Sequence, residues 1–137
     1  MPKPKDRVII DTNLWIHFLL SSDLSKLDSI IANNEIKLIF SGELLDEIVE
    51  VTQRPKFRKY FKLDDVENLL LKIKSRSVFI EVKSEINKCR DPKDNFLLSL
   101  SLDGYATHLL TGDKDLLILK NFGQTKIITI TEYLDEE

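Results

Sequence analysis

Short apolar runs, rich in β-branched residues, alternate with amphipathic stretches along the chain, and this alternation is the feature that most constrains the fold. Apolar residues at helical spacing fill the intervals, so the pattern favours parallel strands joined by helical crossovers. We therefore predict an α/β fold with a five-stranded, largely parallel sheet flanked by helices. The predicted strands are Arg7–Ile10, Lys37–Phe40, Val78–Val82, His108–Thr111 and Lys126–Ile130.

Five segments between these runs are predicted to be helices. Asp91 can cap the last of them, Pro92 suits its first helical position and Gly104 suits its stop. No repeat, low-complexity segment or Gly/Ser linker interrupts the sequence, so we expect one domain over residues 1–137. The predicted helices are Leu14–Leu20, Leu24–Ile31, Gly42–Thr52, Asp64–Ile73 and Pro92–Asp103.

Composition removes several classes of protein. The single cysteine excludes an internal disulfide framework, and no second cysteine or paired histidine suggests a zinc site. No apolar run approaches the ~18 residues of a membrane span, and no long apolar signal segment precedes the first strand. We expect a cytoplasmic protein that is neither exported nor membrane-bound. The net charge of −3 argues against a generic cationic coat for nucleic acid.

Four acidic residues recur near predicted strand ends or on helices beside them. Asp11 ends the first predicted strand, Asp113 follows the fourth, and Asp94 lies in the first turn of the helix that starts at Pro92. Open α/β sheets bind ligands at the carboxyl ends of their strands, but each of these aspartates can also be a simple helix cap. Capping does not explain Glu47, which lies in mid-helix at the border of the apolar face. Its side chain can reach inward over the sheet, or it can simply lie at the edge of a solvated face.

Carboxylates gathered within a few ångströms repel one another, and either proton uptake or a divalent cation relieves the repulsion. An all-oxygen set without nearby histidine or cysteine suits Mg²⁺ or Mn²⁺ better than zinc. Such an ion activates water and neutralises charge on phosphoryl oxygens. The acidic set therefore predicts metal-assisted hydrolysis of a phosphate ester.

Six motifs follow one another along nearly the whole chain. They are Asp11-Thr12-Asn13, Ser41 to Val51 with its internal glutamate, Arg54-Pro55-Lys56-Phe57, Asp91-Pro92-Lys93-Asp94-Asn95, Thr111-Gly112-Asp113-Lys114-Asp115-Leu116 and Ile127 to Leu134. In this order they resemble the PIN domain family, and more narrowly the toxin component of PIN-family type II toxin–antitoxin modules.

The resemblance implies strand order 3-2-1-4-5 and single-stranded RNA cleavage by metal-activated water. It implies that Mg²⁺ or Mn²⁺ is held by the catalytic residues Asp11, Glu47, Asp94 and Asp113, with Asp115 as a further metal ligand. Thr12, Asn13 and Thr111 are then expected to hydrogen-bond the carboxylates. The implied partners are a cognate antitoxin and a second copy of the chain.

An acidic protein needs a local basic patch to attract RNA. Lys88, Arg90 and Lys93 precede Asp94 and are the favoured group for steering substrate. A second group interleaves basic and aromatic side chains, which is typical of phosphate contacts with base stacking, although its aromatics can instead belong to the core. Its members are Arg54, Lys56, Arg58, Lys59 and Lys62 with Phe57, Tyr60 and Phe61.

Other functions stay open at this stage. The chain can be a PIN-type nuclease of RNA processing, or an interaction module in which the acids only cap helices. A phosphoacceptor receiver or an aspartyl-phosphate phosphatase also places aspartate at strand ends. Against these, Asn13 stands where the phosphatase requires a second aspartate, and the third predicted strand ends at Val82-Lys83 without a phosphoacceptor.

Overall fold

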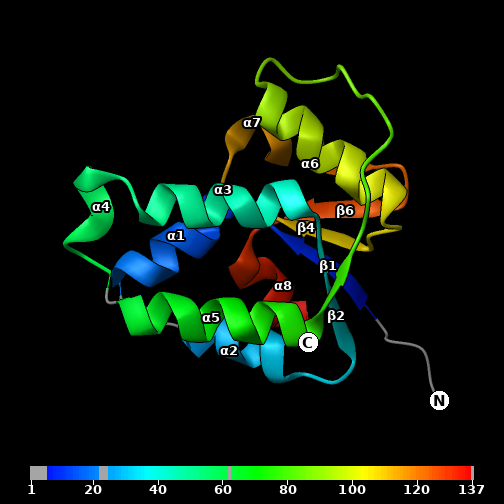
Figure 1. Ribbon diagram of the computed structural model, residues 1–137. Helices are drawn as coiled ribbons and strands as arrows, with labels where there is room; N and C mark the ends of the chain where they lie inside the picture. The colour runs from blue at the N-terminus through cyan, green and yellow to red at the C-terminus, as the bar shows by residue number, and fades with distance from the viewer. Residues whose placement is uncertain (1–5, 22–24, 62, 137) are drawn as a thin grey trace.

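The structure is a computed structural model that describes residues 6–21, 25–61 and 63–136. These residues form one sheet of six strands, flanked by helices (Figure 1). The strands are β1 (Asp6–Ile10), β2 (Ile36–Phe40), β3 (Ser77–Phe79), β4 (His108–Leu110), β5 (Asn121–Phe122) and β6 (Thr125–Ile128). The helices are α1 (Thr12–Ser21), α2 (Ser25–Ala32), α3 (Gly42–Thr52), α4 (Pro55–Arg58), α5 (Leu63–Arg76), α6 (Pro92–Asp103), α7 (Lys114–Leu117) and α8 (Ile130–Glu136).

The sheet order is β3-β2-β1-β4-β6-β5, and all neighbours except β5 and β6 are parallel. The predicted α/β fold and the order of the five predicted strands are confirmed, with β6 as the fifth of them. The register pairs Ile10 of β1 with Leu110 of β4, and the Asp11 amide donates to the Leu110 carbonyl at 3.0 Å. The two central strands therefore end side by side at one edge of the sheet.

β5 was not predicted, because two residues are too few to show the alternation of a strand. It pairs antiparallel with β6 around a turn in which Gly123 has a φ of +58°. β3 ends at Phe79 and not at Val82, since its partner β2 ends at Phe40. The described strands thus differ from the expectation only at the sheet margins and in length.

The last predicted strand stops at Ile128 because a helix signal follows directly. The Thr129 hydroxyl accepts from the Glu132 amide at 3.1 Å, and the Glu132 carboxylate accepts from the Thr129 amide at the same distance. This reciprocal arrangement is a capping box, which starts α8. The spacing of Thr129 and Glu132 was the sequence signal for this helix.

The five predicted helices are all present, whereas α4 and α7, of four residues each, were not predicted. α3 and α6 have the predicted bounds, while α1 and α5 are longer by a few residues. Leu24, the predicted start of the second helix, lies outside the described residues, and α2 covers the remainder. α1 packs against α3, and α2 packs against α5 (Figure 1). None of the helices in the described ranges has the length and apolarity needed to cross a membrane.

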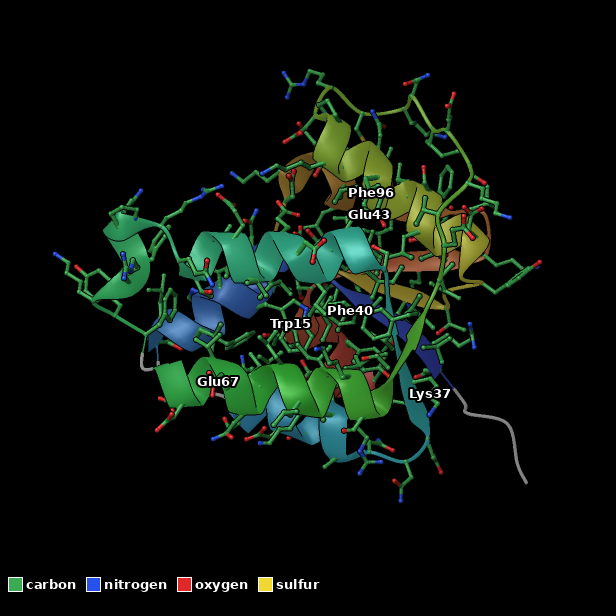
Figure 2. All side chains as sticks on the ribbon, in the orientation of Figure 1. Trp15, Lys37, Phe40, Glu43, Glu67 and Phe96 are labelled. Carbon is green, nitrogen blue, oxygen red and sulfur yellow. The ribbon has the colours of Figure 1, made fainter. Side chains whose placement is uncertain are left out.

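Trp15 anchors the core beneath the carboxyl end of β1. Its ring is fully buried and lies 5.7 Å from that of Phe40, centroid to centroid (Figure 2). The indole N–H donates to the Ile10 carbonyl at 3.1 Å. Phe18 is also buried, so both aromatics belong to the core and not to a surface that stacks bases.

The start and the end of α6 are built by the predicted signals. Asp91 accepts from the Lys93 amide at 2.9 Å, and Pro92 occupies the first turn. Gly104 ends the helix close to β2. A Cβ at this position would lie 2.7 Å from the Ile39 side chain, so the close approach requires glycine. The beginning of α6 is thereby fixed beside the carboxyl ends of the central strands.

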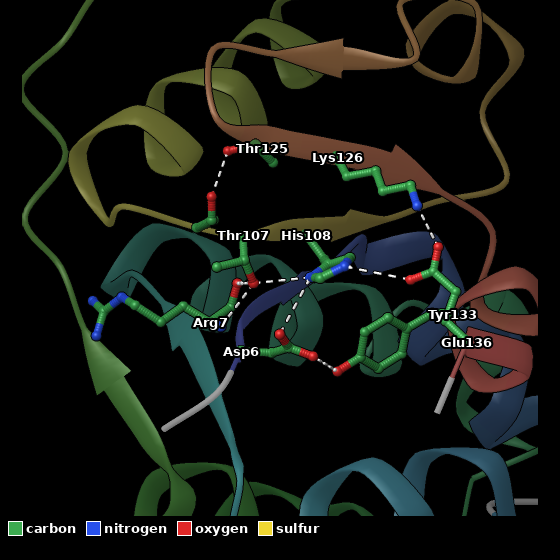
Figure 3. A network of polar contacts seen from close by, with 9 residues as sticks. Asp6, Arg7, Thr107, His108, Thr125, Lys126, Tyr133 and Glu136 are labelled. Carbon is green, nitrogen blue, oxygen red and sulfur yellow. Dashed lines mark hydrogen bonds and ion pairs between the residues drawn. The ribbon is translucent and has the colours of Figure 1, made fainter. Parts of the chain in front are cut away.

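A polar network joins α8 to the amino edge of the sheet, where β1 and β4 begin (Figure 3). The Tyr133 hydroxyl donates to the buried Asp6 carboxylate at 2.6 Å. His108 lies between Asp6 and Glu136, 4.0 Å and 3.7 Å from their carboxylate oxygens, and Lys126 also contacts Glu136. This network therefore lies away from the carboxyl ends of β1 and β4.

Candidate active site

A crevice of about 360 Å³ opens beyond the carboxyl ends of β1 and β4. The residues that line it come from α1, α3, α6 and the segment after β4. Two of them, Glu43 from α3 and Phe96 from α6, are labelled in Figure 2. Six of the lining residues are acids, namely Asp11, Glu43, Glu47, Asp91, Asp94 and Asp113.

Asp11 is buried at the base of the crevice and is held by two hydrogen bonds. The Thr111 hydroxyl donates to its Oδ2 at 2.8 Å, and the Asn13 main-chain amide donates to its Oδ1 at 3.2 Å. Burial raises the pKa of Asp11, the two hydrogen bonds oppose the rise, and the charges of Asp113 and Glu47 add to it. The carboxylate is therefore fixed in position but costly to ionise without a cation.

Asp94 is the most strongly perturbed acid in the crevice. It is only 4% exposed, and its Oδ2 has no hydrogen-bond partner among the residues that the structure describes. Burial and then the adjacent charge of Asp113 raise the pKa of Asp94 from 3.8 to about 7. A buried polar atom without a partner costs about 1–3 kcal/mol, and more when it is charged. A cation in the crevice would remove this cost.

Asp113 combines a helix cap with membership of the acidic cluster. Its Oδ1 accepts from the Asp115 amide at 2.8 Å at the start of α7, and its own amide donates to the Thr111 hydroxyl at 3.0 Å. One carboxylate oxygen from each of Asp94, Asp113 and Asp115 lies within 4.8 Å of the others. Capping, the simple alternative for Asp113, is thus present, but it does not account for this proximity.

Glu47 faces the crevice from α3. The Thr12 hydroxyl donates to its Oε2 at 3.2 Å, and the Lys93 ammonium lies 3.0 Å from its Oε1. The side chain is 28% exposed, so it borders solvent while one oxygen points inward to α1. Sequence reasoning did not include Glu43 in the site, although the spacing of four residues places it on the same helix face as Glu47.

The basic residues expected to bind RNA are not all alike in the structure. Lys93 lines the crevice, whereas one nitrogen of Arg90 donates to both carboxylate oxygens of Asp115, at 2.9 and 3.1 Å. Lys88 lies over the Phe122 ring, 5.7 Å from its centroid. The described members of the second predicted basic group lie elsewhere, on and beside α4.

Arg54 of that second group makes a bidentate contact with Glu50 at 2.8 and 3.0 Å on the exposed side of α3. Lys56 lies over the ring of Phe57, which packs half-buried against the core together with Phe61, so these two rings belong to the core. Arg58 and Lys59 are exposed on or beside α4, where Tyr60 is 58% exposed, while Lys62 lies outside the described residues.

The donor atoms of the crevice fit a hard divalent cation. The groups that converge are carboxylate oxygens, the ligands that Mg²⁺ and Mn²⁺ prefer. The partnerless oxygen of Asp94 and the raised pKa values of Asp11 and Asp94 both mark an excess of negative charge that a cation would neutralise. Among the described residues, the carboxylates that come within reach of one ion are those of Asp94, Asp113 and Asp115. Asp11 and Glu47 line the same crevice but are not part of this group.

The fold and the crevice together define an α/β protein whose carboxylates, gathered where parallel strands end, suit divalent-cation chemistry. The chain belongs to the PIN domain family, which matches residues 7–115. PIN domains are generally nucleases that use divalent metals, so this membership indicates a metal-dependent hydrolase that acts on nucleic acid.

The chain is also similar to the uncharacterized protein MJ1680 of Methanocaldococcus jannaschii. The two are 33% identical over 150 aligned positions, which cover 99% of this chain and 94% of the relative. The similarity therefore extends beyond the PIN match and includes the region of α8. The name of the relative states no activity, so it supports the shared family and not a substrate.

Proposed function

We propose that this protein is an endoribonuclease that uses Mg²⁺ or Mn²⁺ to cleave single-stranded RNA by attack of water. The observation that carries the proposal is the buried Asp94 carboxylate, whose Oδ2 has no partner within the described chain and which lies beside Asp113. Asp11 and Glu47 line the same crevice. Membership of the PIN family supports nuclease chemistry.

In this proposal Asp11, Asp94 and Asp113 hold the metal, and Asp115 is a further ligand. When bound, the ion activates water and neutralises charge on the phosphoryl oxygens. Glu47 holds the metal or orients the attacking water, since its side chain meets both the crevice and solvent.

The neighbouring hydrogen bonds have a positioning role in the reaction. Thr111 holds the Asp11 carboxylate, Thr12 holds that of Glu47, and Asn13 contributes its main-chain amide to Asp11. Carboxylates that are fixed before substrate arrives need no reorganisation during the reaction. These residues therefore position the carboxylates of the site.

The biological role that we propose is the toxin of a type II toxin–antitoxin pair. Residues 1–137 then form a single cytoplasmic PIN domain that assembles as a homodimer, and a cognate antitoxin covers the acidic crevice. A PIN nuclease of RNA processing is the alternative. Growth arrest on induced expression, relieved by coexpression of the gene next to it, supports the toxin; unimpaired growth supports the alternative.

Cleavage by the purified protein tests the activity. We expect single-stranded RNA to be cut with Mg²⁺ or Mn²⁺ and to stay intact with a chelator. Asp11→Asn and Asp94→Asn should each lower the rate at least about 100-fold, the scale of losses for metal-site residues. Asp65→Asn, an exposed acid on α5, is the matched control. Equal cleavage by all three variants would reject the assigned site, and equal cleavage of single-stranded DNA would reject the preference for RNA.

A further inference from the structure

Lys93 is the one basic side chain in the lining of the crevice, as far as the described residues go. It lies in the first turn of α6, one residue before Asp94, and its ammonium contacts Glu47 of α3 at 3.0 Å. The Lys93 side chain is 68% exposed and that of Glu47 is 28% exposed. The contact thus joins two helices across the mouth of the acidic crevice.

We propose that Lys93 exchanges partners during function: it pairs with Glu47 when no cation is bound, is displaced from Glu47 by the cation, and then binds a phosphate of the substrate. The proposal rests on the proposed function, because it names a substrate-binding residue of that same site. It assigns Lys93 two measurable effects of opposite direction, one on cation affinity and one on RNA affinity.

The charges of the crevice require such a residue. The six acids that line the crevice carry six negative charges when all are ionised, so one divalent cation leaves an excess of four. A phosphodiester brings a further negative charge into this space. The field of the cluster therefore repels substrate unless a cationic group lies within a few ångströms of the phosphate.

The neighbouring arginines are less suited to the exchange. Arg54, just beyond the end of α3, is held by Glu50 through two of its nitrogens, and Arg90 contacts both carboxylate oxygens of Asp115 through one nitrogen. Planar guanidinium groups hold carboxylates through such bidentate pairs. Lys93 instead makes a single contact through a compact charge on a flexible stem, and a largely exposed pair of this kind contributes little stability. A divalent cation can therefore displace Lys93 at small cost.

Cation affinity supplies the first test and needs no turnover. Binding of Mn²⁺ is followed by the loss of the electron paramagnetic resonance signal of the free ion. In Lys93→Gln the competing charge at Glu47 is gone, so we expect Mn²⁺ to bind about threefold more tightly than in the wild type. Lys93→Arg keeps the charge and can hold Glu47 at least as firmly, so its Mn²⁺ affinity should be no higher than that of the wild type.

RNA affinity supplies the second test. A short fluorescent oligouridylate is titrated with protein in the presence of Ca²⁺, which also prefers oxygen ligands, and gel electrophoresis verifies that the probe stays intact. We expect Lys93→Gln to bind the probe about threefold to tenfold more weakly, and the slope of log affinity against log salt to fall by about 0.7. Lys93→Arg should bind like the wild type.

Lys72→Gln is the matched control, because Lys72 is an exposed lysine that pairs with an acid, Asp28 at 3.6 Å, on helices α5 and α2. It should leave both affinities unchanged. If Lys93→Gln weakens Mn²⁺ binding, or leaves probe affinity and salt slope unchanged, the exchange is refuted while the proposed function stands. A wild type that binds neither Mn²⁺ nor the probe refutes both.

Discussion

Replacing Asp94 by asparagine should make the metal-free protein more stable. Ionisation of the Asp94 carboxyl costs free energy in the folded protein, because the group is buried and lies beside the charge of Asp113. Asparagine keeps the shape of the side chain without the charge. Most substitutions of buried residues destabilise a protein, so a gain in stability identifies a residue retained for function. The direction of the change is therefore the informative result.

The size of the gain follows from the pKa. An acid whose pKa is about 7 in the folded protein and 3.8 in the unfolded chain favours folding when it is protonated. The free energy of unfolding of the metal-free protein therefore falls as pH rises from about 4 to about 7, by up to about 4 kcal/mol at about 1.36 kcal/mol per pKa unit. Above pH 7 we expect Asp94→Asn to recover about 2–4 kcal/mol of this loss.

Urea unfolding with a chelator, between pH 4 and pH 8, measures the effect. The wild type should lose stability along this range, and the variant should lose less, so that the two curves converge at acidic pH. Added Mn²⁺ should stabilise the wild type at pH 8 by mass action and leave Asp94→Asn nearly unchanged. Asp65→Asn on the exposed face of α5 serves as the control for a charge change alone.

A loss of stability in Asp94→Asn at pH 8 would refute this reasoning, because it would show that the carboxylate stabilises the fold in the manner of a cap. Parallel pH curves for the wild type and the variant would refute it as well. In that case the stabilising partner of Asp94 would have to be sought in its own helix, where Asp91 already caps α6.

Two further predictions concern the scaffold that positions the site. Gly104→Ala should lower the free energy of unfolding in urea by about 1–3 kcal/mol, since the new Cβ would lie 2.7 Å from Ile39 and 2.9 Å from the Leu100 carbonyl. In Gly42→Ala the new Cβ meets nothing within 4 Å, so this control should stay within about 0.5 kcal/mol of the wild type. Equal stability of the two variants would contradict the packing. Tyr133→Phe should cost about 1–3 kcal/mol because the buried Asp6 carboxylate loses its 2.6 Å hydrogen bond. Tyr60→Phe, on a side chain that is 58% exposed, should change nothing, and a similar loss in both would argue against the network at the amino edge.

The parts of the fold that follow from local pattern could be read from the sequence. α6 is the clearest case, because Asp91, Pro92 and Gly104 each act through a few neighbouring atoms and specify its two ends. Asp11 and Asp113 could be placed together once the first and fourth strands were taken as neighbours, and that order came from the family resemblance. The register of β1 and β4 then brings their ends level.

The ion pairs of the site could not be predicted in the same way. Lys93 meets Glu47 and Arg90 meets Asp115 across 46 and 25 positions, through long side chains whose conformations depend on the folded surroundings. Sequence reasoning grouped Lys93 and Arg90 as RNA contacts and did not connect either to an acid. Burial, which sets the pKa of Asp94, likewise depends on the packing of α6 against the sheet and has no local signal.

The fluorescence of Trp15 is a natural probe of the crevice. It is the single tryptophan of the sequence, and its indole N–H donates to the carbonyl of the peptide unit that joins Ile10 to Asp11. A buried indole emits at a wavelength that responds to the local electric field, and here that field includes the carboxylates of the crevice. The unlabelled protein thus carries its own fluorophore bonded to the peptide unit that precedes Asp11, and we expect a stopped-flow record of its emission to time cation loading without any attached dye.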